Sequence, residues 1–592
     1  MTTIAERTDT SGTPGTSTAH GSHPADALVR AARLEALLGD PYDQANPHGL
    51  QALFAADARR EPPAETEALL DAHHVGAEFV PAAQGGLLTR ADHLVRALRP
   101  VFRRDLALGF GHGITSLFAA GVVWAAGSEH QRRYVAARLL DGGRATTLHH
   151  ELAHANAILR HEFTARPGST PGSYLLGGRK DVIINASRAD LQIVYARTDP
   201  ARGPRSHSVL LLDPARHQPH HAQHLPRVDI PGMRGALFSG LEFHDCPVPA
   251  GALVGPAGAG VALALRTFQV NRSLVCGAVT AAADTVLRSA VRAATEGRGG
   301  RPVARRWHKP LAGVFADLLA CDSMSTVALR ALSLLPAGAH VFAAATKYVV
   351  PDLLRENFEE LAPVLGTHGY DHSSPEYGAL GKLARDLPIA GFGHAGRASC
   401  QAALVPQLRN LAERSWFAEP EPPSALFRSG APLPDLDYQL LGIAGGGDFM
   451  AASLVGSASR LAAAHGAGGH IAALAVLAEE FVGELRTLQE QCRRLPTSGA
   501  ALADSAVAVL SDRYCHLVGA AAVLGVWEGQ DGSDPFLANP AWAVLALTRI
   551  GGQLGIPMPE LPEGCQEQVL AELVRRYRDG RSYDLDATAP TP

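Results

Sequence analysis

The sequence is poor in cysteine, and its cysteines follow no metal-binding or redox spacing. The 592 residues include seven cysteines, which are widely scattered, odd in number and without a CxxC pair. A disulfide framework and a cysteine zinc site are therefore not expected. A reducing compartment, the cytoplasm, is the expected location.

Long apolar runs and blocks of one charge are also missing. No window approaches the roughly 20 apolar residues of a membrane span, so we expect no membrane segment. The formal net charge is −5 at pH 7 and no basic block occurs, so we expect neither a nucleic acid nor an anionic membrane as a partner. Residues 1–24 lack the apolar core of a signal peptide and are expected to be a disordered leader.

What remains is an ordinary globular composition, with 46% hydrophobic and 19% charged residues. The chain is too long for one compact core, which predicts two to four domains. Helical periodicity alternates with short β-rich segments bounded by Gly, Pro, Asp and Ser, so we expect an α+β protein. The predicted blocks are an N-terminal helical domain (25–143), a β domain (144–260), a helical bundle (261–412), a Pro-rich linker (413–435), a C-terminal helical domain (436–580) and a disordered tail (581–592).

Seven motifs occur in a fixed order between about residues 30 and 405. They include HELAHANAILRHEFTA (150–165), GGRKDVIINASRADLQIVYART (177–198), VLGTHGY (364–370) and RDLPIAGFGHAG (385–396). Their order and spacing resemble the acyl-CoA dehydrogenase and acyl-CoA oxidase superfamily, and the helical block after residue 435 resembles the extension of its oxidase-like branch. The resemblance implies an N-terminal helical domain, a middle β-barrel, a helical bundle and an extra C-terminal helical domain.

The same resemblance implies an FAD-dependent enzyme that desaturates an acyl thioester between Cα and Cβ. The thioester is expected on CoA or on a carrier protein, in specialised metabolism, and the protein is expected to be a homodimer or tetramer. Such chemistry needs a base beside Cα, a flavin over the Cα–Cβ bond and donors to the thioester carbonyl. The choice between oxidase and dehydrogenase stays open.

Both positions that hold the family's catalytic glutamate carry another residue. The glutamate of the EGT motif aligns with His394, and the alternative glutamate aligns with Asn271, beside Arg272. A histidine can accept a proton near neutral pH, so His394 is the predicted catalytic residue. A polar residue in a pocket that has lost its chemistry is the alternative interpretation. Asn271, Arg272 and Asn156 are the predicted substrate-binding residues.

The predicted flavin site is mixed. Val182 and Ile184 stand where the family has an aromatic residue and a hydroxyl, and His150 stands where it has a threonine. Arg298 stands where the family pairs an arginine with the FAD pyrophosphate. The predicted cofactor-binding residues are Leu148, His150, Val182, Ile184, Arg298, Gly366, Thr367 and Gly396.

Residues 150–154 also spell HExxH, the zincin signature, which requires a helix to bring both imidazoles to one zinc ion. The resemblance predicts a strand-to-loop passage here instead, so no metal is expected. Two other functions stay open beside the flavoenzyme. One is a flavin-free relative that catalyses a non-redox reaction on an acyl thioester, and the other is a non-catalytic partner subunit.

Overall fold

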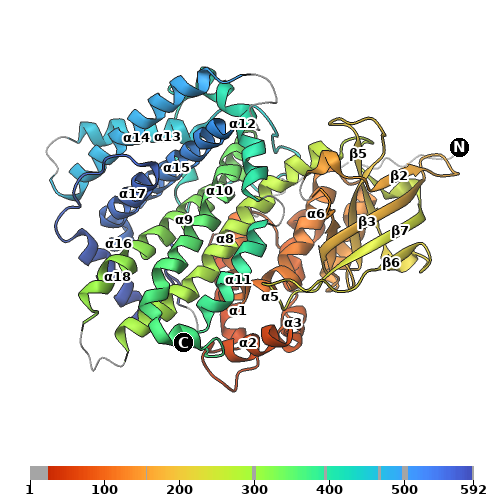
Figure 1. Ribbon diagram of the computed structural model, residues 1–592, viewed down its shortest axis with the longest axis horizontal. Coiled ribbons are helices and arrows are strands. Elements are labelled where there is room, and N and C mark those ends of the chain that lie inside the picture. Colours follow the sequence, from red (N-terminus) through yellow and green to blue (C-terminus); the bar gives the residue numbers. More distant parts are fainter. Residues whose placement is uncertain are drawn as a thin grey trace, which may run out of the picture.

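The computed structural model describes residues 24–154, 157–296, 302–392, 396–464, 468–496 and 504–589. A large helical body lies on one side of the molecule and a β-sheet lies on the other (Figure 1). Helices come first along the chain, strands follow, and helices return, as the sequence predicts.

The first helical block is built around α4 (Ala91–Arg104) and α6 (Thr115–Ala126). Helix α6 has no polar face, and its residues are buried from Thr115 to Ala125. Such a helix is stable only when other elements surround it, and α6 contacts both the sheet and the bundle. The other α-helices of this block are α1 (Pro24–Leu38), α2 (Leu50–Arg59), α3 (Ala64–Ala72), α5 (Leu106–Leu108) and α7 (Glu129–Leu140).

The β block forms one mixed sheet with the strand order β6-β7-β3-β2-β4-β5-β8, and β1 pairs with β4 in parallel. The two longest strands, β3 (Tyr174–Ile184) and β7 (Phe238–Val248), pair antiparallel. No pairing joins the edge strands β6 and β8 among the residues that the structure describes, so the hydrogen-bonded ladder of this middle β domain does not close between them. The remaining strands are β1 (Ala145–Leu148), β2 (Thr164–Pro167), β4 (Leu191–Arg197), β5 (His207–Leu212), β6 (Ala222–His224) and β8 (Leu253–Val254).

The bundle consists of five long helices. Helix α8 (Gly260–Thr295) is 36 residues long and packs against both α9 (His308–Leu334) and α10 (Ala339–Leu365). Its central part is buried on all sides, because α4, α6 and α11 cover the faces that α9 and α10 leave open. The last two helices of the bundle are α11 (Ala379–Phe392) and α12 (Arg397–Arg414).

The C-terminal helices lie beside the bundle, and α15 and α17 contact α9 (Figure 1). The predicted linker is fixed against the body, because the guanidinium of Arg330 donates to the carbonyl oxygens of Leu426 at 3.0 Å and Ser429 at 3.1 Å. The helices of this block are α13 (Phe449–Ala463), α14 (His470–Arg493), α15 (Ser505–Glu528), α16 (Pro535–Ala538), α17 (Ala541–Leu554) and α18 (Cys565–Arg578).

The prediction of a disordered tail is wrong for residues 581–589. Tyr583 is fully buried, and its backbone N–H donates to Asp284 Oδ2 at 2.6 Å. Asp584 lies 2.7 Å from a guanidinium nitrogen of Arg99, and Asp586 accepts from Arg96 at 2.8 Å. The acidic composition resembles that of a solvated tail, but these carboxylates are the counter-ions of buried arginines on α4.

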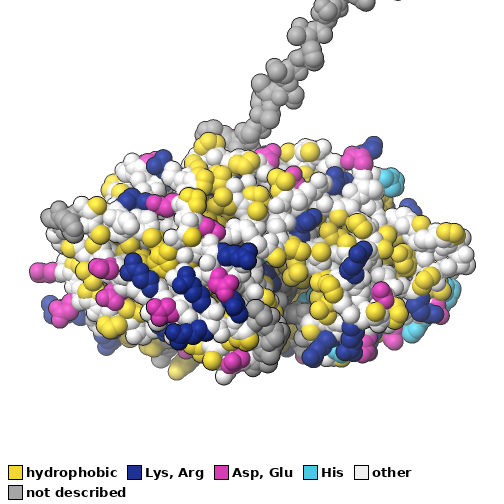
Figure 2. Space-filling model, turned by 90° about the horizontal axis from the view of Figure 1, so that it is seen from above, with side chains coloured by type: hydrophobic (Ala, Val, Ile, Leu, Met, Phe, Trp, Pro, Cys, Tyr) yellow, Lys and Arg dark blue, Asp and Glu magenta, His cyan; other side chains and the backbone are white. Residues whose placement is uncertain are grey.

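The prediction that no segment is long enough to span a membrane is wrong. In the part of the chain that the structure describes, four helical segments are long and apolar enough to cross a membrane by length and composition: 106–126, 260–295, 305–334 and 505–528. Between 67% and 100% of each apolar stretch is buried inside the fold, because other helices cover these faces. On the face in Figure 2, basic and acidic side chains are interspersed, with no block of one sign.

The docked tail yields a stability prediction. Truncating Tyr583 to alanine should lower the free energy of unfolding by about 3–5 kcal/mol, because removal of a fully buried aromatic ring leaves a cavity. Val509→Ala removes a side chain that is 56% exposed and should change stability by less than about 0.5 kcal/mol. Urea unfolding of both variants measures the difference, and equal midpoints would contradict the docked position of the tail.

Candidate active site

A cavity of about 320 Å³ lies where the N-terminal helices, the sheet and the bundle meet. Phe110, Thr115 and Phe118 line it from the first block, while Val275, Ile389 and Ala390 line it from the bundle. Most of the wall is apolar, as expected of a small-molecule pocket. The sheet side of the wall includes Thr146, Thr147, His150, Glu151, Leu152, Val182, Ile183, Ile184, Ile230, Met233 and Phe238.

A π-helical turn, η3 (Gly109–Ile114), shapes one wall of this cavity. Asn185 follows β3 with a positive φ of 62° and donates from Nδ2 to the carbonyl oxygen of Gly111 at 2.6 Å. A Cβ at Gly109 would lie 2.3 Å from the ring of Phe102, so this position requires glycine. Sequence reasoning missed this turn, although the string GFGHGI was a signal, since π-turns gather at functional sites.

Two buried hydroxyl groups line the cavity without a hydrogen-bond partner in the described part of the chain. They are Thr115 Oγ1 and Thr147 Oγ1, on residues that are 5% and 8% exposed. The neighbouring Thr146 is satisfied, because its hydroxyl donates to the carbonyl oxygen of Ile184 at 2.6 Å. An unpaired buried hydroxyl is costly, so these two groups indicate where a ligand would offer polar atoms.

A buried ion pair holds the loop that follows β1. Lys180 Nζ lies 2.8 Å from Glu151 Oε1 and also donates to the carbonyl oxygen of His149 at 3.1 Å. The carboxylate of Glu151 accepts two further hydrogen bonds, from the backbone N–H groups of Glu162 at 2.7 Å and Phe163 at 3.1 Å. Glu151 therefore has a structural role, and the pair fixes the backbone beside His150.

The pKa of each partner follows from this burial. Burial disfavours the charge on Glu151, but the Lys180 ammonium and the hydrogen bonds outweigh it and hold the pKa of this carboxyl below its usual value. Burial lowers the pKa of Lys180 to about 8, although Glu151 opposes the shift. Both groups are therefore ionised at neutral pH.

The HExxH string does not form a zinc site. Glu151 takes part in a β-bridge and residues 152–154 form a turn, so the helix that the zincin motif requires is missing there. Neither does the described part of the chain hold any group of three His, Cys, Asp or Glu side chains able to bind a metal. The ring of His149 instead packs in the interior, 5.2 Å from the ring of His150 and 5.0 Å from that of His161.

The structure brings three of the predicted cofactor-binding residues together. His150, Val182 and Ile184 all line the cavity, and Leu148 lies in the sheet core at the end of β1. Sequence reasoning missed Thr115, Thr147 and the aromatic residues of the first block, because they come from elements far apart in the chain.

The other described candidates lie elsewhere. Asn271 and Arg272 are buried in α8 outside the cavity lining, and Arg272 donates to the carbonyl oxygen of Ser399 at 3.4 Å. Gly366 and Thr367 form an exposed 3-10 turn after α10, and Gly396 is the N-cap of α12. Asn156, Arg298 and His394 lie outside the described residues.

The protein-family model "Acyl-CoA dehydrogenase, C-terminal domain" matches residues 258–404. The chain is 28% identical over 202 residues to cyclohex-1-ene-1-carbonyl-CoA dehydrogenase of Geobacter metallireducens, a match that covers 33% of this chain and 52% of that relative. The two matches place the bundle region of this chain, residues 258–404, in the acyl-CoA dehydrogenase superfamily.

Solved structures of this superfamily share the fold. An acyl-CoA dehydrogenase of Bacillus anthracis complexed with FAD aligns with a TM-score of 0.66 at 16% identity, covering 94% of this chain and 96% of that one. The prolyl acyl carrier protein oxidase AnaB aligns with a TM-score of 0.53 at 16% identity, covering 64% of this chain and 97% of that one. The first alignment includes the C-terminal helices that the sequence predicted.

The buried pair yields the second prediction. Lys180→Met leaves the Glu151 carboxylate buried without its cation and should lower the free energy of unfolding by about 3–5 kcal/mol. Adding Glu151→Gln to this variant should recover part of the loss. Arg179→Met is the matched control, because the side chain of Arg179 is 55% exposed and pairs with Asp181 on the same strand, so its loss should cost at most about 1 kcal/mol. Equal losses in Lys180→Met and Arg179→Met would contradict the role of the pair.

Proposed function

We propose that this protein is an FAD-dependent oxidoreductase that acts on an acyl thioester. The observation that carries the proposal is the apolar cavity at the junction of the three family domains, lined by the ends of β1 and β3. One motif of the resemblance, 177–198, begins within β3, and another, 150–165, begins in the loop directly after β1. The matched relatives named acyl-CoA dehydrogenases support the same assignment.

The residues of the cavity fit the flat ring system of a flavin. Val182 and Ile184 offer apolar surface to a ring face, and the unpaired hydroxyls of Thr115 and Thr147 can donate to its polar edge. When bound, FAD would accept the hydride that leaves Cβ of the substrate. The cavity lining of the described residues has no arginine or lysine, so the pyrophosphate requires a cation from elsewhere.

We expect a second copy of the chain to supply this cation for the pyrophosphate. The exposed turn Gly366–Tyr370 supports this expectation, because its surface is free to contact a neighbour. Tyr370 is 82% exposed, and the ring of His368 stacks on that of Tyr377 with 4.4 Å between centroids. We expect a homodimer or tetramer in which Gly366, Thr367 and Arg298 of one chain face the cofactor of its neighbour. Such an arrangement explains why one chain alone does not bring Gly366 and Thr367 to its cavity.

In this proposal, a histidine removes the α proton of the substrate. Glu151 is the one carboxylate among the described residues that line the cavity, and its ion pair and backbone hydrogen bonds keep it from serving as a base. His394 would then take the α proton of the substrate. Lys347 Nζ donates to the carbonyl oxygens of Ala390 and Gly391, both at 3.2 Å, so a buried cation fixes the end of α11 close to that position in the sequence.

The substrate class is an acyl thioester on CoA or on a carrier protein. The carrier-protein oxidase among the fold relatives supports the second form, and the dehydrogenases support the first. We place the protein in the cytoplasm, which suits its seven free, buried thiols.

An absorption spectrum of the purified chain, with and without added FAD, tests the cofactor. A bound flavin spectrum is expected, and Thr147→Val should weaken FAD binding about three- to tenfold by removing one hydrogen bond. Thr346→Val is the matched control, because this buried hydroxyl is equally unpaired but lies outside the cavity lining. A chain that binds no FAD yet turns over acyl thioesters would overturn the redox assignment in favour of a non-redox reaction.

Replacing His394 with alanine tests the base. We expect turnover to fall at least about a hundredfold, which is the usual contribution of acid–base catalysis. The flavin spectrum and the unfolding midpoint should not change. Full activity in this variant would rule out His394 as the catalytic residue.

A further inference from the structure

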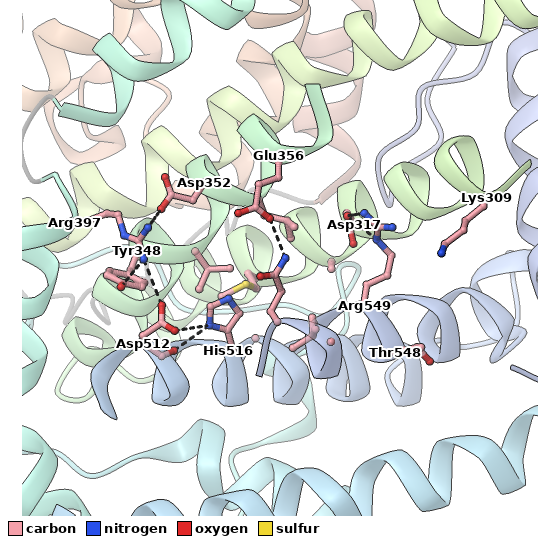
Figure 3. A pocket seen from close by; sticks show the side chains of 18 residues that line it. Lys309, Asp317, Tyr348, Asp352, Glu356, Arg397, Asp512, His516, Thr548 and Arg549 are labelled. Carbon is pink, nitrogen blue, oxygen red and sulfur yellow. Dashed lines mark hydrogen bonds and ion pairs between the residues drawn. The ribbon is translucent and has the colours of Figure 1, made fainter. Parts of the chain in front are cut away.

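A second cavity, of about 520 Å³, separates the bundle from the C-terminal helices. Helices α9 and α10 form one wall, α15 and α17 form the other, and Arg397 reaches in from α12 (Figure 3). It shares no lining residue with the candidate active site, as far as the described residues show. The proposed oxidoreductase function does not use it.

At one end of this cleft, two carboxylates share a single arginine. Arg397 pairs with Asp352 of α10 and lies 3.3 Å from Asp512 of α15. Its guanidinium also stacks over the ring of Tyr348 at 4.2 Å from the centroid. His516 belongs to the same end, where its Nδ1 lies 3.0 Å from the carbonyl oxygen of Asp512 and 3.9 Å from the carboxylate oxygen Oδ2 of the same residue. Two carboxylates therefore share one guanidinium at this end.

At the other end, two carboxylates likewise share one arginine, and Lys309 lies beyond it. Arg549 of α17 donates to Asp317 of α9 at 2.8 Å and to Glu360 of α10 at 2.7 Å. Asp317 is 1% exposed, and its second carboxylate oxygen, Oδ1, has no hydrogen-bond partner among the described residues. Burial raises the pKa of Asp317 to about 6, despite the arginine beside it. A buried carboxylate oxygen in a cleft lining is an unfilled acceptor position.

Between the two ends the wall combines apolar side chains with one more carboxylate. Glu356 accepts a hydrogen bond from Gln553 Nε2 at 2.9 Å, and Arg355 lies 3.8 Å away on its outer side. Met324, Val349, Leu353 and Ile550 supply apolar surface along the cleft, and the side chain of Lys309 is exposed beyond Arg549.

The spacing of the two ends follows from α10. Asp352 and Glu360 are eight residues apart on this helix, and a rise of 1.5 Å per residue separates them by about 12 Å. One metal ion cannot contact carboxylates this far apart. An anion is disfavoured as well, because both arginines already pair with two carboxylates each.

We propose that this cleft binds a linear polyamine, with an ammonium group at each end and its methylene chain along Leu353, Met324 and Ile550. One ammonium would take the acceptor position at Asp317 Oδ1, and the other would lie at the end formed by Asp352 and Asp512, beside the guanidinium that bridges them. Because the two walls belong to different helical blocks, a bound polyamine ties the C-terminal helices to the bundle and stabilises the folded chain.

Calorimetric titration of the full chain with spermidine, whose terminal nitrogens are about as far apart as the two ends, tests the proposal. We expect binding at least tenfold tighter than for the shorter putrescine or for Mg²⁺ at equal ionic strength, and a rise in melting temperature with spermidine. Asp317→Asn should weaken spermidine binding at least tenfold. Glu359→Gln removes a charge from the same helix outside the cleft, where the carboxylate is 71% exposed and pairs with Arg355, and should change binding less than twofold.

If Asp317→Asn folds poorly, a second variant that fills the cleft with a large side chain still tests whether spermidine binds there. A Cβ at Gly552 in the cleft meets no atom within 4 Å, so Gly552→Phe should block spermidine without disturbing the fold. Gly483→Phe, at an equally open helical glycine outside the cleft, is its control. Equal affinity for spermidine, putrescine and Mg²⁺, or unchanged affinity in Gly552→Phe, would overturn the proposal and identify the binding as adventitious.

Discussion

The buried pair of Lys180 and Glu151 is the constraint on which the candidate active site depends. It joins the middle of β3 to the loop after β1, and these two segments supply most of the sheet side of the cavity. The desolvation of both charges is offset only while every hydrogen bond is made, so the pair permits one arrangement of the loop. The backbone next to His150 and the cavity wall at Val182 are therefore fixed together.

The cavity itself shows how a shared fold can carry an altered pocket. Its shape comes from backbone elements that the superfamily fold supplies: the ends of β1 and β3, the π-turn before α6, and the middle of α8. Its chemistry comes from a few side chains, and here Val182 and Ile184 make the sheet wall apolar. The polar contacts of the cavity then shift towards Thr115 and Thr147, which belong to neighbouring elements. In the proposed function, such a pocket would hold the flavin ring through surface contact more than through hydrogen bonds.

The sequence predicted the order of the blocks well, because helical and strand periodicities are local properties. The mostly apolar helix α6 and the short β-rich segments around β3 are examples. The motifs of the resemblance also placed His150, Val182 and Ile184 on one wall. The sequence could not predict which residues of separate elements meet in the cavity, because their proximity depends on packing between domains. Thr115 and Phe110 are examples.

The docked segment at 583–586 sets an order of events during synthesis. Arg96 and Asp586 are separated by 490 residues in sequence, yet they form one ion pair inside the protein. A ribosome adds about 5–20 residues per second, so Arg96 waits for roughly 25 to 100 seconds before Asp586 emerges. Arg99 can pair earlier with Asp322 of α9, but its contact with Asp584 forms only after that residue has also emerged. The final packing around this part of α4 is thus completed later than the packing of α4 on the bundle.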